Sequence, residues 1–230
     1  MPAITTLTLD LDDTLWPVWP AIRRAEALLH DWLLQHAPAT AAAHDLAALR
    51  RIRAAVAEAH PEWAHDLSAL RRESIRLALA EAGDDPALAV PAFEVFFAAR
   101  QQVQPFDDVP QALARLARRF RIVALSNGNA DIQRVPGLGQ HFHAAVSARE
   151  LGLGKPAPEA FAAACQRAGC RPEQALHVGD DGPLDVDGAL AAGLQAAWVC
   201  RPELPPPAAP TRSPQHVVAT LAELAGRLGC

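Results

Sequence analysis

Two aspartates separated by one residue, Asp10 and Asp12, follow the first apolar run of the chain, in the segment LDLDDTL at residues 9–15. A carboxylate placed where a buried strand ends can attack a phosphoryl group, and a carboxylate two residues later can reach the leaving-group side of the same phosphoryl group. Taken alone, such a pair more often caps a turn or a helix. A catalytic interpretation therefore requires partner groups elsewhere in the chain.

Three later segments carry polar or charged side chains where an apolar run or a turn ends. These side chains are Ser126, Asn127, Lys155, Asp180, Asp181 and Asp185. In an open parallel sheet, ligands bind outside the carboxyl ends of the strands. We therefore expect all of these groups to face the same crevice as Asp10 and Asp12.

The types of these side chains fit phosphoryl transfer. A phosphate monoester is a dianion, so a carboxylate can attack it only when a metal ion and fixed cationic or hydrogen-bonding groups neutralise the charge. Magnesium prefers hard oxygen ligands, which Asp10 and Asp180 would supply. We expect Asp10 to form an aspartyl-phosphate, while Asp12 protonates the departing alkoxide and then accepts a proton from the hydrolytic water.

Further side chains are predicted to bind the substrate phosphate. They are Thr14, Ser126, Asn127 and Lys155. Ser126 would donate a hydrogen bond to a phosphoryl oxygen, Lys155 would offset charge on the reacting group, and Thr14 would also support the loop. Asp181 and Asp185 leave two roles open, since one could bind a metal-bound water or orient Lys155 and the other could cap the following helix.

The elements that must position these groups are short apolar runs bounded by turn residues. They cover residues 5–11, 121–125, 175–178 and 196–200, and residues 144–147 form a weaker fifth run. Near-continuous apolar runs separated by helical patterns are typical of a parallel sheet covered by helices on both faces. The predicted fold class is therefore α/β, with a doubly wound parallel sheet.

A long helical segment interrupts this alternation straight after the first strand. Residues 16–103 contain no strand-like run and show helical spacing of apolar residues four times. We predict an all-helical insertion over residues 16–103, with the core formed by residues 1–15 and 104–230. Several arginines of the insertion could attract an anionic substrate, although such charges are more often solvated helix faces. They include Arg23, Arg24, Arg71, Arg72 and Arg76.

The ordered segments at residues 10–14, 126–127, 155–156 and 179–185 resemble the four motifs of the haloacid dehalogenase-like (HAD) phosphohydrolases. This resemblance implies a Rossmann-like core with a helical, C1-type cap inserted after the first motif, and it places the backbone carbonyl of Asp12 on the magnesium ion. Segments within residues 177–198 further resemble the flavin mononucleotide phosphatases that also dephosphorylate the ribitylaminouracil phosphate of riboflavin synthesis. This finer resemblance implies a flavin-pathway substrate.

Composition narrows the partners and the location. The 230 residues carry 21 Lys and Arg against 26 Asp and Glu, and the net charge of −5 argues against binding to a nucleic-acid backbone. No apolar stretch approaches the roughly 20 residues of a membrane span, and the N-terminus lacks the pattern of a signal peptide. We expect a cytoplasmic protein, a monomer or weak dimer, that binds Mg²⁺ and a small phosphorylated metabolite.

Three other functions share parts of this pattern. A haloacid dehalogenase uses an aspartate nucleophile but needs neither a metal nor a second acid, so Asp12 and the acidic segment at residues 180–185 argue against it. A receiver-type signalling domain would carry its phosphoacceptor at the end of the third strand, where residues 146–148 read Val-Ser-Ala, and it would lack the insertion. A non-catalytic phosphate-binding scaffold would not need the complete set of groups.

Overall fold

The structure, a computed structural model, describes residues 3–230 of the chain. These residues form two compact units. The first contains the chain up to Pro17 together with Gln104–Cys230, and the second contains Val18–Val103. Trp16, which we assigned to the insertion, belongs to the first unit, because its indole and its backbone are both bonded to the loop that carries Asp12.

A six-stranded sheet forms the centre of the first unit, in the order β3-β2-β1-β4-β5-β6, and every neighbouring pair is parallel. The strands are β1 (Thr6–Leu9), β2 (Arg121–Ser126), β3 (Ala144–Ser147), β4 (Ala175–Gly179), β5 (Gln195–Val199) and β6 (His216–Val218). This sheet confirms the predicted α/β fold class. The sequence did not predict β6, because three residues at an exposed sheet edge leave no recognisable apolar run.

The register of the central strands aligns the positions at which they end. Every residue of β1 and β4 is buried, as expected for strands covered by helices on both faces. Leu9 at the end of β1 pairs with Ala124 of β2 and with Val178 of β4. The residues that follow these strands therefore meet at the same edge of the sheet.

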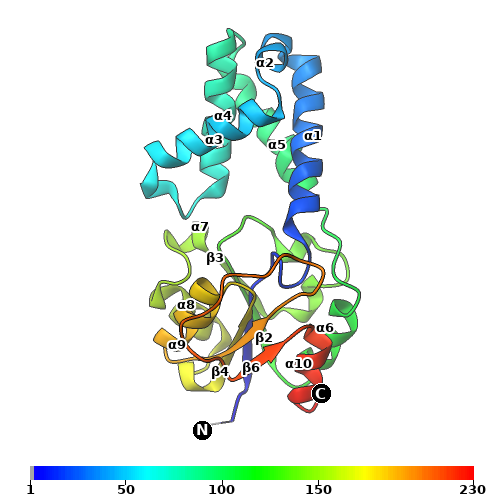
Figure 1. Cartoon of the computed structure of the whole chain (residues 1–230), viewed down its shortest axis with the longest axis vertical. Helices are drawn as coiled ribbons and strands as arrows, with labels where there is room; N and C mark the ends of the chain where they lie inside the picture. The colour runs from blue at the N-terminus through cyan, green and yellow to red at the C-terminus, as the bar shows by residue number, and fades with distance from the viewer. Residues whose placement is uncertain (1–2) are drawn as a thin grey trace. The chain divides into compact units, whose positions relative to one another are not determined.

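Helices cover both faces of this sheet. They are α6 (Val109–Ala117), α7 (Ala148–Leu151), α8 (Pro158–Ala168), α9 (Gly188–Ala191) and α10 (Leu221–Arg227), with short 3-10 turns η3 (Ile132–Arg134), η4 (Gly139–His141) and η5 (Pro172–Gln174). Figure 1 shows α8 and α9 on one side of the sheet and α6 and α10 on the other. The helix that we expected after Asp181 is a π-helical turn, η6 (Gly182–Asp187), followed by α9.

The second unit contains only helices among its ordered elements. They are α1 (Val18–His36), α2 (Pro38–Ala43), α3 (Leu46–Ala59), α4 (Leu67–Ala82) and α5 (Ala89–Arg100), with 3-10 turns η1 (Pro61–Trp63) and η2 (Pro86–Leu88). Apolar faces of α1, α4 and α5 form its core, with Leu33, Leu79 and Phe96 almost completely buried. The sequence did not predict α2, because its six residues are mostly alanine and show no apolar stripe. Among the described residues, none of the helices combines the length and apolarity needed to cross a bilayer.

Candidate active site

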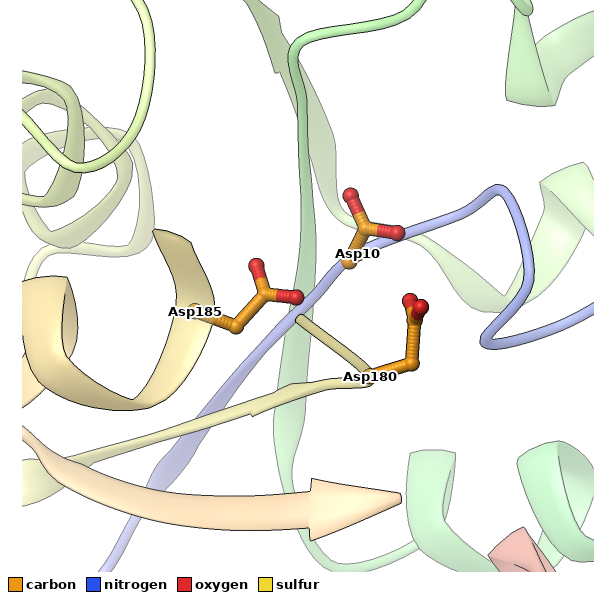
Figure 2. Close-up of side chains that lie close together, drawn as sticks. All are labelled: Asp10, Asp180 and Asp185. Atoms are coloured by element: carbon orange, nitrogen blue, oxygen red, sulfur yellow. The ribbon is translucent and has the colours of Figure 1, made fainter. Parts of the chain in front are cut away.

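Three carboxylates converge at the edge of the sheet where the parallel strands end (Figure 2). Asp10 follows β1, Asp180 follows β4 and Asp185 lies in η6, and each can place an oxygen atom within 4.8 Å of the others. The pairing of β1 with β4 causes this convergence, since the backbone N–H of Asp10 donates to the carbonyl of Val178 at 2.9 Å. Asp185, which we expected to play a supporting role, therefore adjoins both side chains that we predicted as metal ligands.

A buried lysine lies between two of these carboxylates. The Lys155 Nζ atom donates to Oδ1 of Asp10 and to Oδ1 of Asp185, both at 2.6 Å. Burial lowers the pKa of Lys155, but the two carboxylates more than offset burial and raise that pKa above its ordinary value. For Asp185 the balance is similar, since Lys155 and His177 overcome the effect of burial and hold the pKa below the ordinary range. The ammonium group therefore stays charged.

The remaining negative charge of the cluster is not balanced by Lys155. Burial, together with the nearby charge of Asp185, raises the pKa of Asp180 to about 7. Burial also raises the pKa of Asp10 well above its ordinary value, although Lys155 acts in the opposite direction. Carboxylate oxygens are the ligands that hard divalent cations prefer. Asp10, Asp180 and Asp185 therefore form a donor set that could hold such a cation and whose excess charge the cation would neutralise.

Asp12 lies on a tight loop, and a hydrogen bond from the indole of Trp16 restrains its side chain. The Trp16 Nε1 atom donates to Oδ1 of Asp12 at 2.8 Å, and Asp13 between them adopts a left-handed backbone conformation with φ of 58°. Gly128 passes so close that a Cβ atom there would lie 2.5 Å from Oδ2 of Asp12. The loop after β2 therefore approaches this carboxylate within a distance that only glycine allows.

Ser126 and Asn127 lie at the end of β2, as predicted, and make different contacts. The Ser126 hydroxyl is buried and accepts a hydrogen bond from the backbone N–H of Gly128 at 3.0 Å. The Asn127 amide donates to the carbonyl of Lys155 and accepts from its N–H, both at 2.8 Å. These two bonds tie the Lys155 loop to β2. The contacts of Ser126 and Asn127 with a phosphate stay predictions.

The two roles left open for Asp181 and Asp185 go to different residues. Asp181 Oδ1 accepts from the backbone N–H of Leu184 at 2.8 Å, which is the geometry of a helix cap. Asp185 is the residue that orients Lys155, and its Oδ2 accepts from the N–H of Asp181 at 2.9 Å. Thr14 supports the acidic cluster, since its hydroxyl donates to Oδ1 of Asp180 at 2.9 Å.

A buried histidine that we did not single out from the sequence, His177, forms a hydrogen bond with Asp185. His177 Nε2 lies 3.0 Å from Oδ1 of Asp185, and Nδ1 lies 2.8 Å from the Thr8 hydroxyl. Burial lowers the pKa of His177, so the neutral ring donates to Asp185 through Nε2 and accepts from Thr8 through Nδ1. The sequence did contain a signal for this role, because His177 is the single polar residue within the apolar run of β4.

Trp198 within β5 and Arg201 just after it bond to the loops that carry Asp180 and Thr14. Trp198 Nε1 donates to the backbone carbonyl of Asp180 at 2.7 Å. Arg201 is buried, donates to the carbonyl of Thr14 through Nε and Nη2, and pairs with Asp108 at 2.6 Å. The sequence offered no periodic signal for either residue, because their partners lie far away along the chain.

The comparisons with known proteins agree with this geometry. A model of the haloacid dehalogenase-like hydrolases matches residues 4–193. The chain belongs to the haloacid dehalogenase-like hydrolases. The ordered motifs and the sheet that carries them are thus those of this family.

Several relatives extend the family assignment. The 5-amino-6-(5-phospho-D-ribitylamino)uracil phosphatase YigB of Escherichia coli is 36% identical over 208 residues, which cover 87% of this chain and 84% of the relative. A phosphoserine phosphatase of Thermus thermophilus is 39% identical over 138 residues, 56% of this chain and 55% of the relative. This HAD-like hydrolase is a phosphatase.

A solved structure resembles the whole chain. The crystal structure of a 2-haloacid dehalogenase from Pseudomonas syringae is 40% identical, has a TM-score of 0.88 and covers 98% of each chain. Its name points to a different reaction of the same family. Likeness of fold within this family therefore does not by itself fix the reaction.

Proposed function

We propose that this HAD phosphatase hydrolyses a small phosphate monoester through an aspartyl-phosphate on Asp10, with magnesium as its cofactor. The observation that carries the proposal is the buried cluster in which Lys155 joins Asp10 to Asp185 beside Asp180. Asp10, Asp180 and the backbone carbonyl of Asp12 would hold the magnesium ion. When bound, the ion would offset negative charge on the phosphoryl group and on the carboxylates.

Asp10 and Asp12 would divide the reaction between them. A carboxylate oxygen of Asp10 forms a bond to phosphorus as the bond between phosphorus and the ester oxygen breaks, and Asp12 gives its proton to that oxygen. Asp12 then accepts a proton from water, which attacks phosphorus and releases Asp10. The Trp16 bond supports this assignment, because it keeps the Asp12 carboxyl in one orientation through both steps.

Lys155 and Ser126 would stabilise the phosphoryl group while it is transferred. Lys155 keeps Asp10 oriented and supplies the positive charge beside it. Ser126, buried at the end of β2, would donate its hydroxyl hydrogen to a phosphoryl oxygen while accepting from Gly128. Thr14 and Asn127 would position other residues of the site. The Thr14 hydroxyl donates to Asp180, and the Asn127 amide donates to the backbone carbonyl of Lys155.

The site favours phosphate hydrolysis over removal of a halogen. Hydrolysis of a carbon–halogen bond by an aspartate needs neither a second acid two residues later nor a cation site. This chain has Asp12 held by Trp16 and has three carboxylates for a single lysine. Each of these features has a direct function in phosphoryl transfer.

We further propose a phosphorylated intermediate of riboflavin synthesis, or flavin mononucleotide, as the substrate. The support is the relative from Escherichia coli, whose name gives the ribitylaminouracil phosphate as its substrate. The match to it covers 87% of this chain and 84% of the relative. Because that match covers 87% of this chain, it includes at least part of the second unit, whereas the match to the phosphoserine phosphatase covers 56% of this chain.

The experiment is phosphate release from a panel of monoesters that contains the ribitylaminouracil phosphate, flavin mononucleotide, phosphoserine, sugar phosphates and nucleotides. Each is assayed with magnesium and with a chelator, and 2-chloropropionate serves as the dehalogenase substrate. We expect magnesium-dependent phosphate release that Asp10→Asn abolishes, and no halide release. Halide release without magnesium would contradict the phosphatase mechanism, whereas equal activity on all esters would remove only the flavin-pathway substrate.

A further inference from the structure

The second unit contains a cluster of one carboxylate and three guanidinium groups, here named the Glu26 cluster. Its members are Glu26 of α1, Arg50 and Arg53 of α3, and Arg71 of α4. Glu26 and Arg71 are each 5% exposed. The arginines of α1 that we also considered, Arg23 and Arg24, are exposed instead.

Both oxygen atoms of the Glu26 carboxylate already have arginine partners. Its Oε2 atom accepts from Nε of Arg50 at 2.8 Å and lies 2.7 Å from Nη2 of the same residue. Its Oε1 atom lies 3.3 Å from Nη1 of Arg71. Arg71 also places its guanidinium over the ring of Phe96, 4.1 Å from the centroid. One carboxylate therefore serves two arginines before Arg53 is considered.

Arg53 adds a further positive charge that this carboxylate does not bind directly. Its Nε atom is shielded from solvent and has no hydrogen-bond partner within the described part of the chain. Burial lowers the pKa of Arg71 to about 10, and the like charge of Arg53 is the next largest cause. Within the cluster, three cations face one anion. Buried charges and buried N–H groups are normally paired, so this arrangement lacks an anion.

We propose that the Glu26 cluster binds an oxyanion, either a carboxylate or a phosphate group of a small metabolite, through the guanidinium groups of Arg53 and Arg71. Guanidinium groups present planar pairs of N–H donors that match such oxyanions. A bound oxyanion would accept from the terminal nitrogens of these guanidinium groups and reduce the repulsion between the two arginines. The site is independent of the hydrolytic mechanism, because none of its residues belongs to the acidic cluster or to the loops that support it.

The test uses the full chain in buffers free of phosphate and sulfate, at constant ionic strength set with chloride. Inorganic phosphate and malonate are the two probes, so a response to one or the other identifies the preferred oxyanion. We expect saturable movement of the Arg53 Nε–H resonance in ¹⁵N-resolved NMR spectra. That resonance reports on the second unit, so phosphate bound beside Asp10 does not imitate the signal.

The variant Arg53→Met keeps the apolar stem and removes the charge. Its matched control is Arg51→Met, on the same helix but exposed to solvent. We expect Arg53→Met to weaken binding of the effective probe at least about tenfold, as loss of a charge-assisted hydrogen bond should, and Arg51→Met to leave it unchanged. In probe-free buffer, Arg53→Met should unfold at the same or a higher temperature than Arg51→Met.

Two results of the binding experiment would overturn the proposal. One is an Arg53 resonance that moves with neither probe. The other is a probe response that both variants retain equally, which would show that the binding takes place elsewhere. A lower unfolding temperature of Arg53→Met in probe-free buffer would likewise contradict it, because Arg53 would then serve to balance Glu26 rather than to bind a ligand.

Discussion

Lys155 is the residue on which the charge balance of the site depends. Its ammonium is buried and bonds Asp10 and Asp185 at 2.6 Å each. In such a pair the desolvation cost of each charge is offset only while its partner is present. In the mechanism that we propose, the residue therefore has two roles, one in the stability of the fold and one in charge neutralisation during catalysis.

We predict that Lys155→Met lowers the free energy of unfolding by about 3–5 kcal/mol, since it leaves two buried carboxylates without their cation. Urea denaturation measures this loss. The double variant Lys155→Met with Asp185→Asn should recover part of it, because one uncompensated carboxylate is then neutral. A loss below about 1 kcal/mol in the single variant would show that the carboxylates do not need Lys155, contrary to this prediction.

The indole of Trp16 donates to Asp12, the proposed general acid and base. We predict that Trp16→Phe lowers kcat roughly tenfold to a hundredfold, because a hydrogen bond to a charged group contributes about 1.5–3 kcal/mol, and leaves KM nearly unchanged. The ring of phenylalanine keeps most of the buried packing. Trp19→Phe is the matched control, since Trp19 is 58% exposed. Equal effects of the two substitutions on kcat would contradict a specific role of the Trp16 indole.

At the scale of elements, the site depends on the tie between β2 and the loop before α8. Asn127 supplies that tie with one donor and one acceptor bond to the Lys155 backbone. The loop after β2 also brings Gly128 against Asp12. Two segments that lie far apart in the sequence therefore set the positions of the lysine and of the second carboxylate.

We predict that Asn127→Ala lowers kcat and reduces the free energy of unfolding by about 1–3 kcal/mol, since two hydrogen bonds are lost. Steady-state kinetics and urea denaturation measure the two effects. A double-mutant cycle tests the mechanism: in the Lys155→Met background, Asn127→Ala should have little further effect on kcat. Fully additive losses in kcat would mean that Asn127 does not act through Lys155.

At the scale of the whole molecule, excess negative charge in the acidic cluster should make stability depend on magnesium. Repulsion from Asp185 and burial disfavour the ionised form of Asp180, whose pKa is raised to about 7. Asp180→Asn keeps an oxygen that can accept from Thr14 and removes the charge. The variant therefore separates the cost of the charge from its use as a ligand.

We predict that magnesium raises the unfolding temperature of the native chain, with a stabilisation of about 2.7 kcal/mol at a hundred times the dissociation constant. In metal-free buffer at pH 8, Asp180→Asn should be at least as stable as the native chain, but magnesium should no longer stabilise it. Thermal unfolding with and without magnesium measures both effects. An undiminished magnesium effect in the variant would contradict a role of Asp180 as a ligand.

Much of the fold was predictable because its signals are local. The buried strands and the helical insertion each show as a pattern of apolar residues within a short window, and the structure contains a strand at every predicted run. Three elements departed from prediction: β6 and α2 are too short to show a pattern, and residues 182–191 divide into η6 and α9. The wider π turn arises where Asp181 caps the turn and Asp185 bonds back to it.

The sequence by itself determined the fold class, the groups gathered at one edge of the sheet and the reaction type that those groups suit. Only the tertiary structure decided their partners. Lys155 donates to both Asp10 and Asp185, and Thr14 donates to Asp180. Hydrogen bonds from His177, Trp198 and Arg201 then hold the acidic cluster and the Thr14 loop in place. The physical reason is that apolar periodicity is a local property of the chain. A hydrogen bond between residues 145 positions apart depends on which strands are neighbours and in which register they pair.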